Sequence, residues 1–146
     1  FIDLVNKLDY LIILLGSKDE IAMGNYLQEN CKEGQILNLI GKTKIEEIIP
    51  YFSSADIFLG HDSGLSWFSS ITRTPTIVLH GPTDPTYYGP TNDWVHKLQS
   101  NSNCLNCYNF RDSINGKMYK CQNNICLKEL KVSTVADAIK RIVERI

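Results

Sequence analysis

The 146-residue chain has 15 basic and 16 acidic side chains and a formal net charge of −1. This balance excludes a general nucleic-acid binder, whose surface is normally strongly basic. Apolar residues make up 43% of the chain, and the longest apolar run, Tyr10 to Leu15, is far shorter than the roughly 20 residues of a membrane span. We therefore expect a globular protein with no transmembrane segment.

The first two-thirds of the chain alternate between predicted helices and strands. Apolar positions at every third and fourth residue predict a helix over 1–8. The apolar run over 10–15 predicts a strand buried on both faces of a parallel sheet. Thr43, with Glu46 three residues later, predicts a capped helix start. Further helices are predicted over 19–30, 43–52 and 63–71, and further strands over 35–40, 55–59 and 75–80.

This alternation predicts an α/β fold, a Rossmann-like doubly wound parallel sheet with right-handed crossovers. Residues 94–98 predict a last strand, and Val132 to Ile146 a closing helix. We expect a single domain over 1–146. It would consist of an α/β core (1–98), a cysteine-rich loop (99–127) and a terminal helix (128–146). Because the chain starts inside a predicted helix, without Met, we expect it to be a fragment of a longer protein.

Glycine and polar residues follow each of the first four predicted strands. Since ligands bind beyond the carboxyl ends of parallel strands, these loops together predict a ligand site. The loops are Gly16-Ser17, Gly41-Lys42-Thr43, Gly60-His61-Asp62-Ser63-Gly64 and Gly81-Pro82-Thr83-Asp84.

Two of these loops suggest particular ligand contacts. Asp62, Ser63 and Gly64 precede a helix, where free backbone N–H groups and the helix dipole favour phosphate. The alternative, equally weighted by the pattern, is that Asp62 or Ser63 only caps the helix. Glu20 is suited to accept hydrogen bonds from ribose hydroxyls. Taken alone, it is better explained as a first-turn carboxylate stabilised by the helix dipole.

Four of the five cysteines have the spacing Cys104-x2-Cys107-x13-Cys121-x4-Cys126. Two close pairs separated by a loop match tetrahedral thiolate sites for structural zinc or iron. Disulfides between the pairs and four free thiols are the alternatives. Because no export signal is seen, we expect a reducing cytoplasm, which disfavours disulfides.

The histidines show no metal-ligand spacing, and no set of residues stands out as catalytic. His80, at a predicted strand end, is expected to be a hydrogen-bonded packing residue. His61 is a weak candidate for ligand contact because it adjoins the predicted phosphate turn.

The order and spacing of these loops resemble the C-terminal domain of glycosyltransferase family 9, the ADP-heptose:lipopolysaccharide heptosyltransferases. The matching segments are Gly41-Lys42-Thr43, Ser54-Ala55-Asp56, Asp62-Ser63-Gly64-Leu65-Ser66, Thr74 to Leu79 and Gly81-Pro82-Thr83-Asp84-Pro85. The resemblance implies a GT-B enzyme that inverts the sugar and needs no metal or other cofactor at the reacting centre. This chain would be its donor-binding half, without the N-terminal acceptor domain and its catalytic base.

The resemblance also implies roles for individual residues. Asp62 would contact the sugar, and Glu20 would hold the ribose. Trp67 replaces a His of the family and would either stack on a ligand or, by default, pack in the core. The other implied donor-binding residues are Ser63, Gly64 and Leu65 for the diphosphate, Thr43 for the adenine pocket, and Gly16 and Ser17 beside Glu20.

The implied partners are an ADP-sugar donor and, through the missing domain, a glycan or lipid-linked acceptor of bacterial lipopolysaccharide or envelope glycan synthesis. The expected location is the cytoplasm, including the periphery of the inner membrane. The fragment alone is expected to bind ADP weakly and to be inactive. Two other functions stay open: a metal-knuckle interaction module on an α/β scaffold, and a nucleotide-sugar epimerase-like domain.

Overall fold

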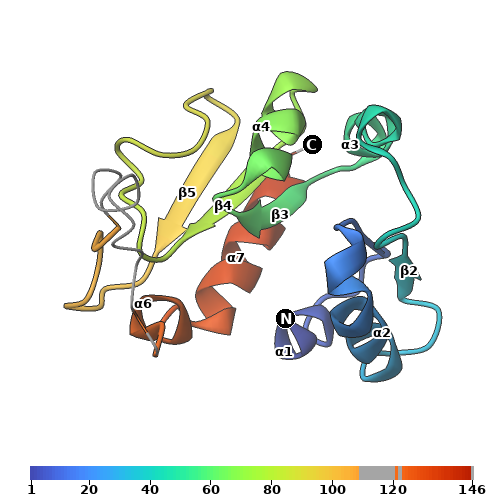
Figure 1. Ribbon diagram of the computed structural model, residues 1–146, viewed down its shortest axis with the longest axis horizontal. Helices are drawn as coiled ribbons and strands as arrows, with labels where there is room; N and C mark the ends of the chain where they lie inside the picture. The colour runs from blue at the N-terminus through green and yellow to red at the C-terminus, as the bar shows by residue number, and fades with distance from the viewer. Residues whose placement is uncertain (109–120, 122, 146) are drawn as a thin grey trace. The chain divides into compact units, whose positions relative to one another are not determined.

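The computed structural model describes residues 1–108, 121 and 123–145. The chain divides into two compact units, Phe1–Tyr51 and Phe52–Ile146, whose elements are labelled in Figure 1. The middle of the predicted cysteine-rich loop and the last residue of the predicted terminal helix lie outside the described residues.

The first unit contains a small parallel sheet. Its elements are α1 (Ile2–Val5), β1 (Ile12–Leu14), the 3-10 helix η1 (Lys18–Glu20), α2 (Ile21–Glu29), β2 (Ile36–Asn38) and the 3-10 helix η2 (Ile45–Glu47). Strands β1 and β2 pair in parallel, with Ile13 opposite Leu37. These two side chains are 37% and 44% exposed, whereas Ile36 and Asn38 are buried. The prediction that the first strand is buried on both faces is therefore wrong: side chains alternate across this sheet, and one face is exposed.

The helix predicted over 43–52 begins later and is broken. It comprises η2 and α3 (Ile49–Ser54), which spans the division between the units. The first turn is capped by Glu47, whose Oε2 accepts the Lys44 N–H at 2.9 Å. The predicted cap by Thr43 and Glu46 is wrong by one residue. Pro50 fits the first turn of α3 because N–H groups there have no intrahelical acceptor.

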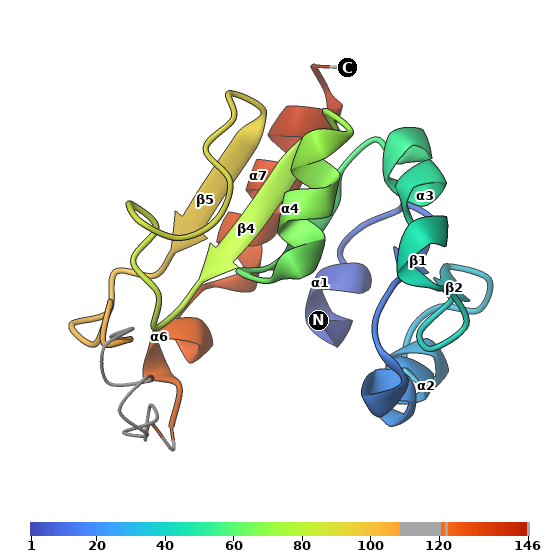
Figure 2. The same ribbon diagram turned by 45° about the horizontal axis from the view of Figure 1, so that its top comes forward.

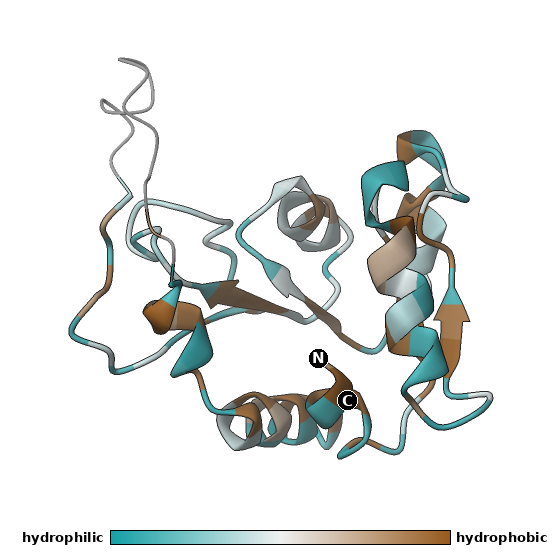
Figure 3. Cartoon of the chain, turned by 60° about the horizontal axis from the view of Figure 1, so that its bottom comes forward, coloured by the Kyte–Doolittle hydropathy of each residue, from teal (hydrophilic) through white to brown (hydrophobic). Residues whose placement is uncertain are grey.

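The second unit is built on a three-stranded parallel sheet in the order β3-β4-β5. After α3, the elements of this unit are β3 (Phe58–His61), α4 (Gly64–Ile71), β4 (Thr76–His80), β5 (Val95–Gln99), α6 (Ile125–Lys128) and α7 (Val132–Val143). The central strand β4 is buried along its whole length. Figures 2 and 3 show α4 on one face of this sheet and α7 on the other. The α/β class and the parallel pairing predicted from the sequence are confirmed.

Helix α4 buries its polar face. Ser66, Ser69 and Ser70 are at most 5% exposed, and the Ser69 and Thr76 hydroxyls lie 2.6 Å apart. Trp67 and Ile71 are instead 52% and 73% exposed. The default expectation that Trp67 packs in the core is therefore wrong, because the small serine side chains occupy the sheet-facing side.

Within the described part of the chain, no helix has the length and apolar character needed to cross a membrane.

Candidate functional site

The loop after β1 is organised around the Glu20 carboxylate. Its Oε2 accepts hydrogen bonds from the Ser17 backbone N–H at 2.7 Å and from the Ser17 hydroxyl at 3.0 Å. Gly16 allows this approach, since a Cβ at Gly16 would stand 2.8 Å from the same oxygen. Glu20 therefore caps the start of η1 through its side chain. The sequence had suggested a first-turn carboxylate stabilised by the helix dipole and had not identified this cap.

The loop after β2 adjoins this capped turn. The Gly41 N–H donates to the Gly16 carbonyl at 3.0 Å, so the two strand ends of the first unit are joined. Gly41 has φ +71°, a conformation that favours glycine. Lys42 Nζ donates to the Asn38 carbonyl at 2.8 Å, and half-buried Thr43 follows. The first unit thus places Gly16, Ser17 and Glu20 together, with Thr43 in the adjoining loop.

The turn between β3 and α4 holds the remaining predicted donor-binding residues. Ser63 is the N-cap of α4 but makes no side-chain capping hydrogen bond, and its carbonyl accepts the Ser66 hydroxyl at 2.6 Å. Gly64 is exposed, and apart from Gly64, its two chain neighbours and the nearby backbone of its own helix, no described heavy atom lies within 4 Å of a Cβ built on it. The first turn of α4 therefore presents backbone N–H groups that no Ser63 side chain covers, as an anion site requires.

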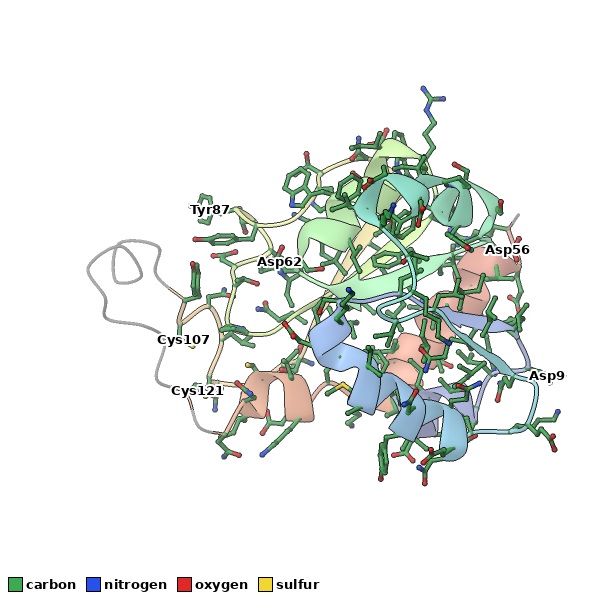
Figure 4. All side chains as sticks on the ribbon, turned by 45° about the vertical axis from the view of Figure 1, so that its right-hand side comes forward. Asp9, Asp56, Asp62, Tyr87, Cys107 and Cys121 are labelled. Atoms are coloured by element: carbon green, nitrogen blue, oxygen red, sulfur yellow. The ribbon has the colours of Figure 1, made fainter. Side chains whose placement is uncertain are left out.

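Beside this turn lies a buried histidine that sequence reasoning treated as packing. His80, the last residue of β4, is 0% exposed, and its Nδ1 lies 3.1 Å from the Thr83 hydroxyl. Burial lowers the pKa of His80 below its ordinary value, and the nearby Asp62 carboxylate opposes this shift. Asp62, labelled in Figure 4, follows the end of the neighbouring strand β3.

Gly89 joins this group from the loop between β4 and β5. It has φ +77°. A Cβ built on Gly89 would stand 3.4 Å from His80 Nε2 and 3.6 Å from Asp62 Oδ1. Sequence reasoning included Thr83 in one of the four strand-end loops but did not identify Gly89, since nothing local to Gly89 points to Asp62.

The same loop is held by two side chains of β5. Lys97 Nζ donates to the carbonyls of Pro85 at 2.6 Å and Tyr88 at 2.7 Å. Gln99 Nε2 donates to the carbonyl of Gly81 at 3.1 Å. These bonds fix the backbone of the loop, and therefore the position of Gly89, against the sheet.

The cysteine cluster (Cys104, Cys107, Cys121 and Cys126) adjoins the loop after β4, since a Cβ built on Gly81 would stand 3.2 Å from Cys126 Sγ. Cys104 and Cys107 are exposed, whereas Cys126 is buried. Burial raises the pKa of the Cys126 thiol, and the other three cysteines raise it further. Cys121 Sγ also accepts the Asn124 N–H at 3.2 Å. Among the described residues, no three His, Cys, Asp or Glu side chains are arranged to hold a metal ion. A metal or disulfide at the cluster stays a prediction.

Comparison with known proteins identifies the family. Residues 1–118 match glycosyltransferase family 9 (heptosyltransferase), and the chain belongs to this family. It is 30% identical over 99 residues to lipopolysaccharide heptosyltransferase 3 of Escherichia coli K12, covering 66% of this chain and 28% of that protein. It is 27% identical over 135 residues to lipooligosaccharide heptosyltransferase 2 of Campylobacter jejuni serotype O:6, covering 90% and 40%.

Solved structures share the fold. The E. coli ADP-heptose lps heptosyltransferase II superposes with a TM-score of 0.78 at 16% identity, over 99% of this chain and 40% of that one. A family 9 glycosyl transferase from Veillonella parvula gives 0.80 at 17% identity, over 100% and 41%. The chain thus spans about two fifths of these proteins.

Proposed function

We propose that this chain is the donor-binding part of an inverting glycosyltransferase of bacterial lipopolysaccharide or envelope glycan synthesis, and that its donor is an ADP-sugar such as ADP-heptose. The observation that carries the proposal is the open first turn of α4 directly after Asp62. Membership of the family and the names of the relatives support it, whereas they lend nothing to an epimerase or a metal-knuckle module.

The first turn of α4 suits a diphosphate. The backbone N–H groups at Ser63, Gly64 and Leu65 lie at the positive end of the helix dipole, and Gly64 leaves room for the ligand. The same N–H groups would stabilise the negative charge that grows on the diphosphate as the sugar leaves. We assign no metal or other cofactor to this step.

The other contacts follow the same assignment. The Asp62 carboxylate would accept hydrogen bonds from hydroxyls of the donor sugar, as ionised carboxylates do. In the first unit, Glu20 would hold the ribose through the oxygen that its bonds to Ser17 do not use, and Thr43 would line the adenine pocket. The acceptor and the catalytic base belong to the rest of the protein in this proposal.

Calorimetry with ADP and ADP-heptose tests the proposal. The chain should bind both, and Asp62→Ala should weaken ADP-heptose by about tenfold while changing ADP much less, because Asp62 is assigned to the sugar. Asp56→Ala, which removes another carboxylate of the second unit, is the matched control and should change neither affinity. Equal affinities of Asp62→Ala and the unchanged chain for ADP-heptose would contradict the assignment.

A further inference from the structure

A small space over Gly89 is bordered by two polar atoms. Apart from Gly89 and its chain neighbours, the nearest heavy atoms to a Cβ built there are His80 Nε2 at 3.4 Å, His80 Cε1 at 3.5 Å and Asp62 Oδ1 at 3.6 Å. Both distances are in the range of ordinary van der Waals contact, so His80 Nε2 and Asp62 Oδ1 both lie next to the side of Gly89 that carries no Cβ. Because Gly89 has no side chain, the side on which a Cβ would project is left open beside these two polar atoms.

His80 Nε2 needs a partner that the described residues do not supply. Its side chain is 0% exposed, and Nε2 makes no hydrogen bond among them. A buried polar group left unpaired loses its hydrogen bonds to water without replacing them, so native proteins rarely contain one. The other ring nitrogen is already engaged with Thr83.

We propose that His80 Nε2 and Asp62 Oδ1 bind one hydroxyl group of the donor sugar, held in the space over Gly89. This inference rests on the proposed donor-binding function and adds to it a second side chain that recognises the sugar.

The hydrogen-bond donors and acceptors of His80, Asp62 and a sugar hydroxyl are complementary. With the Thr83 hydroxyl donating to Nδ1, the neutral imidazole carries its proton on Nε2 and donates it to the sugar oxygen. The O–H of the sugar is then donated to the Asp62 carboxylate. The burial of His80 favours the neutral ring that this arrangement requires.

The site is also held in place. The Lys97 ammonium bonds to two carbonyls of the loop that carries Gly89 and lies 3.4 Å from the Gly89 carbonyl itself. The space over Gly89 is therefore set by the backbone and by β5, and not by a freely rotating side chain.

Two substitutions distinguish the roles of the two ring nitrogens of His80. The amide of His80→Gln reaches the position of Nε2, whereas that of His80→Asn reaches only the position of Nδ1. We expect His80→Asn to weaken ADP-heptose by about tenfold and ADP by less than twofold, and His80→Gln to restore most of the lost affinity. His96→Asn, at an exposed histidine of β5, should change neither affinity.

A measurement on the unchanged chain does not depend on any variant folding. With 15N-labelled histidine, ADP-heptose should shift the His80 Nε2 resonance and ADP should not. If ADP-heptose binds but neither the resonance nor the His80→Asn affinity responds, the space holds only water and the inference is wrong. If neither nucleotide binds, the proposed function itself fails and the inference falls with it.

Discussion

Glu20 and Ser17 show how one carboxylate is shared between the protein's own backbone and a proposed ligand. Oε2 of Glu20 receives both hydrogen bonds from Ser17. Neither this capping box nor the use of a single oxygen for both bonds was predicted from the sequence. The remaining oxygen is the one that the ribose would use.

Glu20→Ala and Ser17→Ala should separate the two roles. Glu20→Ala removes both hydrogen bonds of the cap and should lower the free energy of unfolding by about 1 kcal/mol, measured by chemical denaturation. Ser17→Ala removes only the bond from the hydroxyl, because the backbone N–H remains, and should lower it by less. Only Glu20→Ala removes the carboxylate, so only it should weaken ADP in calorimetry. If Ser17→Ala weakens ADP equally, Glu20 acts through the shape of the loop and not by contact.

His80 should make stability depend on pH. Its pKa in the folded protein is lowered from 6.5 by burial, with Lys97 acting in the same direction and Asp62 and Asp84 opposing it. The unfolded chain therefore takes up the proton first as pH falls. We expect full stability above about pH 6.5 and a loss below it, as urea denaturation from pH 8 to pH 5 would show. The loss should shrink in His80→Gln and persist in His96→Gln.

The cysteine cluster should react unevenly. Cys104 and Cys107 are exposed, whereas Cys126 is buried and its thiol has a raised pKa, so less of it is thiolate at neutral pH. Iodoacetamide followed by peptide mass spectrometry should label Cys104 and Cys107 first and Cys126 last. If none of the four reacts before denaturation, a metal or disulfides hold the cluster, as the cysteine spacing predicted.

At the scale of elements, α4 shows how hydrophobic periodicity can mislead. Its apolar residues suggest a buried stripe that includes Trp67, yet the serines face the sheet. Ser66 and Ser69 are fully buried. Their small side chains let the helix backbone lie close to the sheet, where the Ser69 hydroxyl is 2.6 Å from the Thr76 hydroxyl of β4. The start of α4 lies at the end of β3 because only Asp62 and Ser63 separate the two elements in the chain.

Larger side chains on the buried serine face of α4 should destabilise the folded protein. We expect Ser66→Val to lower the free energy of unfolding by about 1–3 kcal/mol, because the buried site has no room for two added carbons. Ile71→Ser, on the exposed face of the same helix, should change it by about 0.5 kcal/mol or less. Urea denaturation of the two variants compares them directly, and similar losses would contradict the packing described for α4.

At the scale of the whole molecule, the chain consists of two units, each with its own parallel sheet. The predicted donor-binding residues come from both: Gly16, Ser17, Glu20 and Thr43 from the first, and Asp62 to Leu65 from the second. The division into units was not foreseen, because strand and helix alternation continues across residue 51 without a break.

Hydrogen exchange can test whether one donor molecule uses both sets. ADP-heptose should slow amide exchange in residues 16–20 and 62–65, since both are proposed to contact it. Residues 132–143 of α7 serve as the internal reference and should be unaffected. Protection confined to residues 62–65 would remove Glu20 from the proposed site.

The sequence by itself determined the α/β class, most elements to within a few residues, and the strand-end loops that resemble the family. These features are local: apolar periodicity sets helix or strand, and glycine marks the end of a strand. Only the tertiary structure decided that the serines of α4 face inward and that His80, Asp62 and Gly89 meet. The parallel register pairs His61 with Leu79, which brings the ends of β3 and β4 together. Lys97 then holds Gly89 over them, through contacts between residues far apart in the chain.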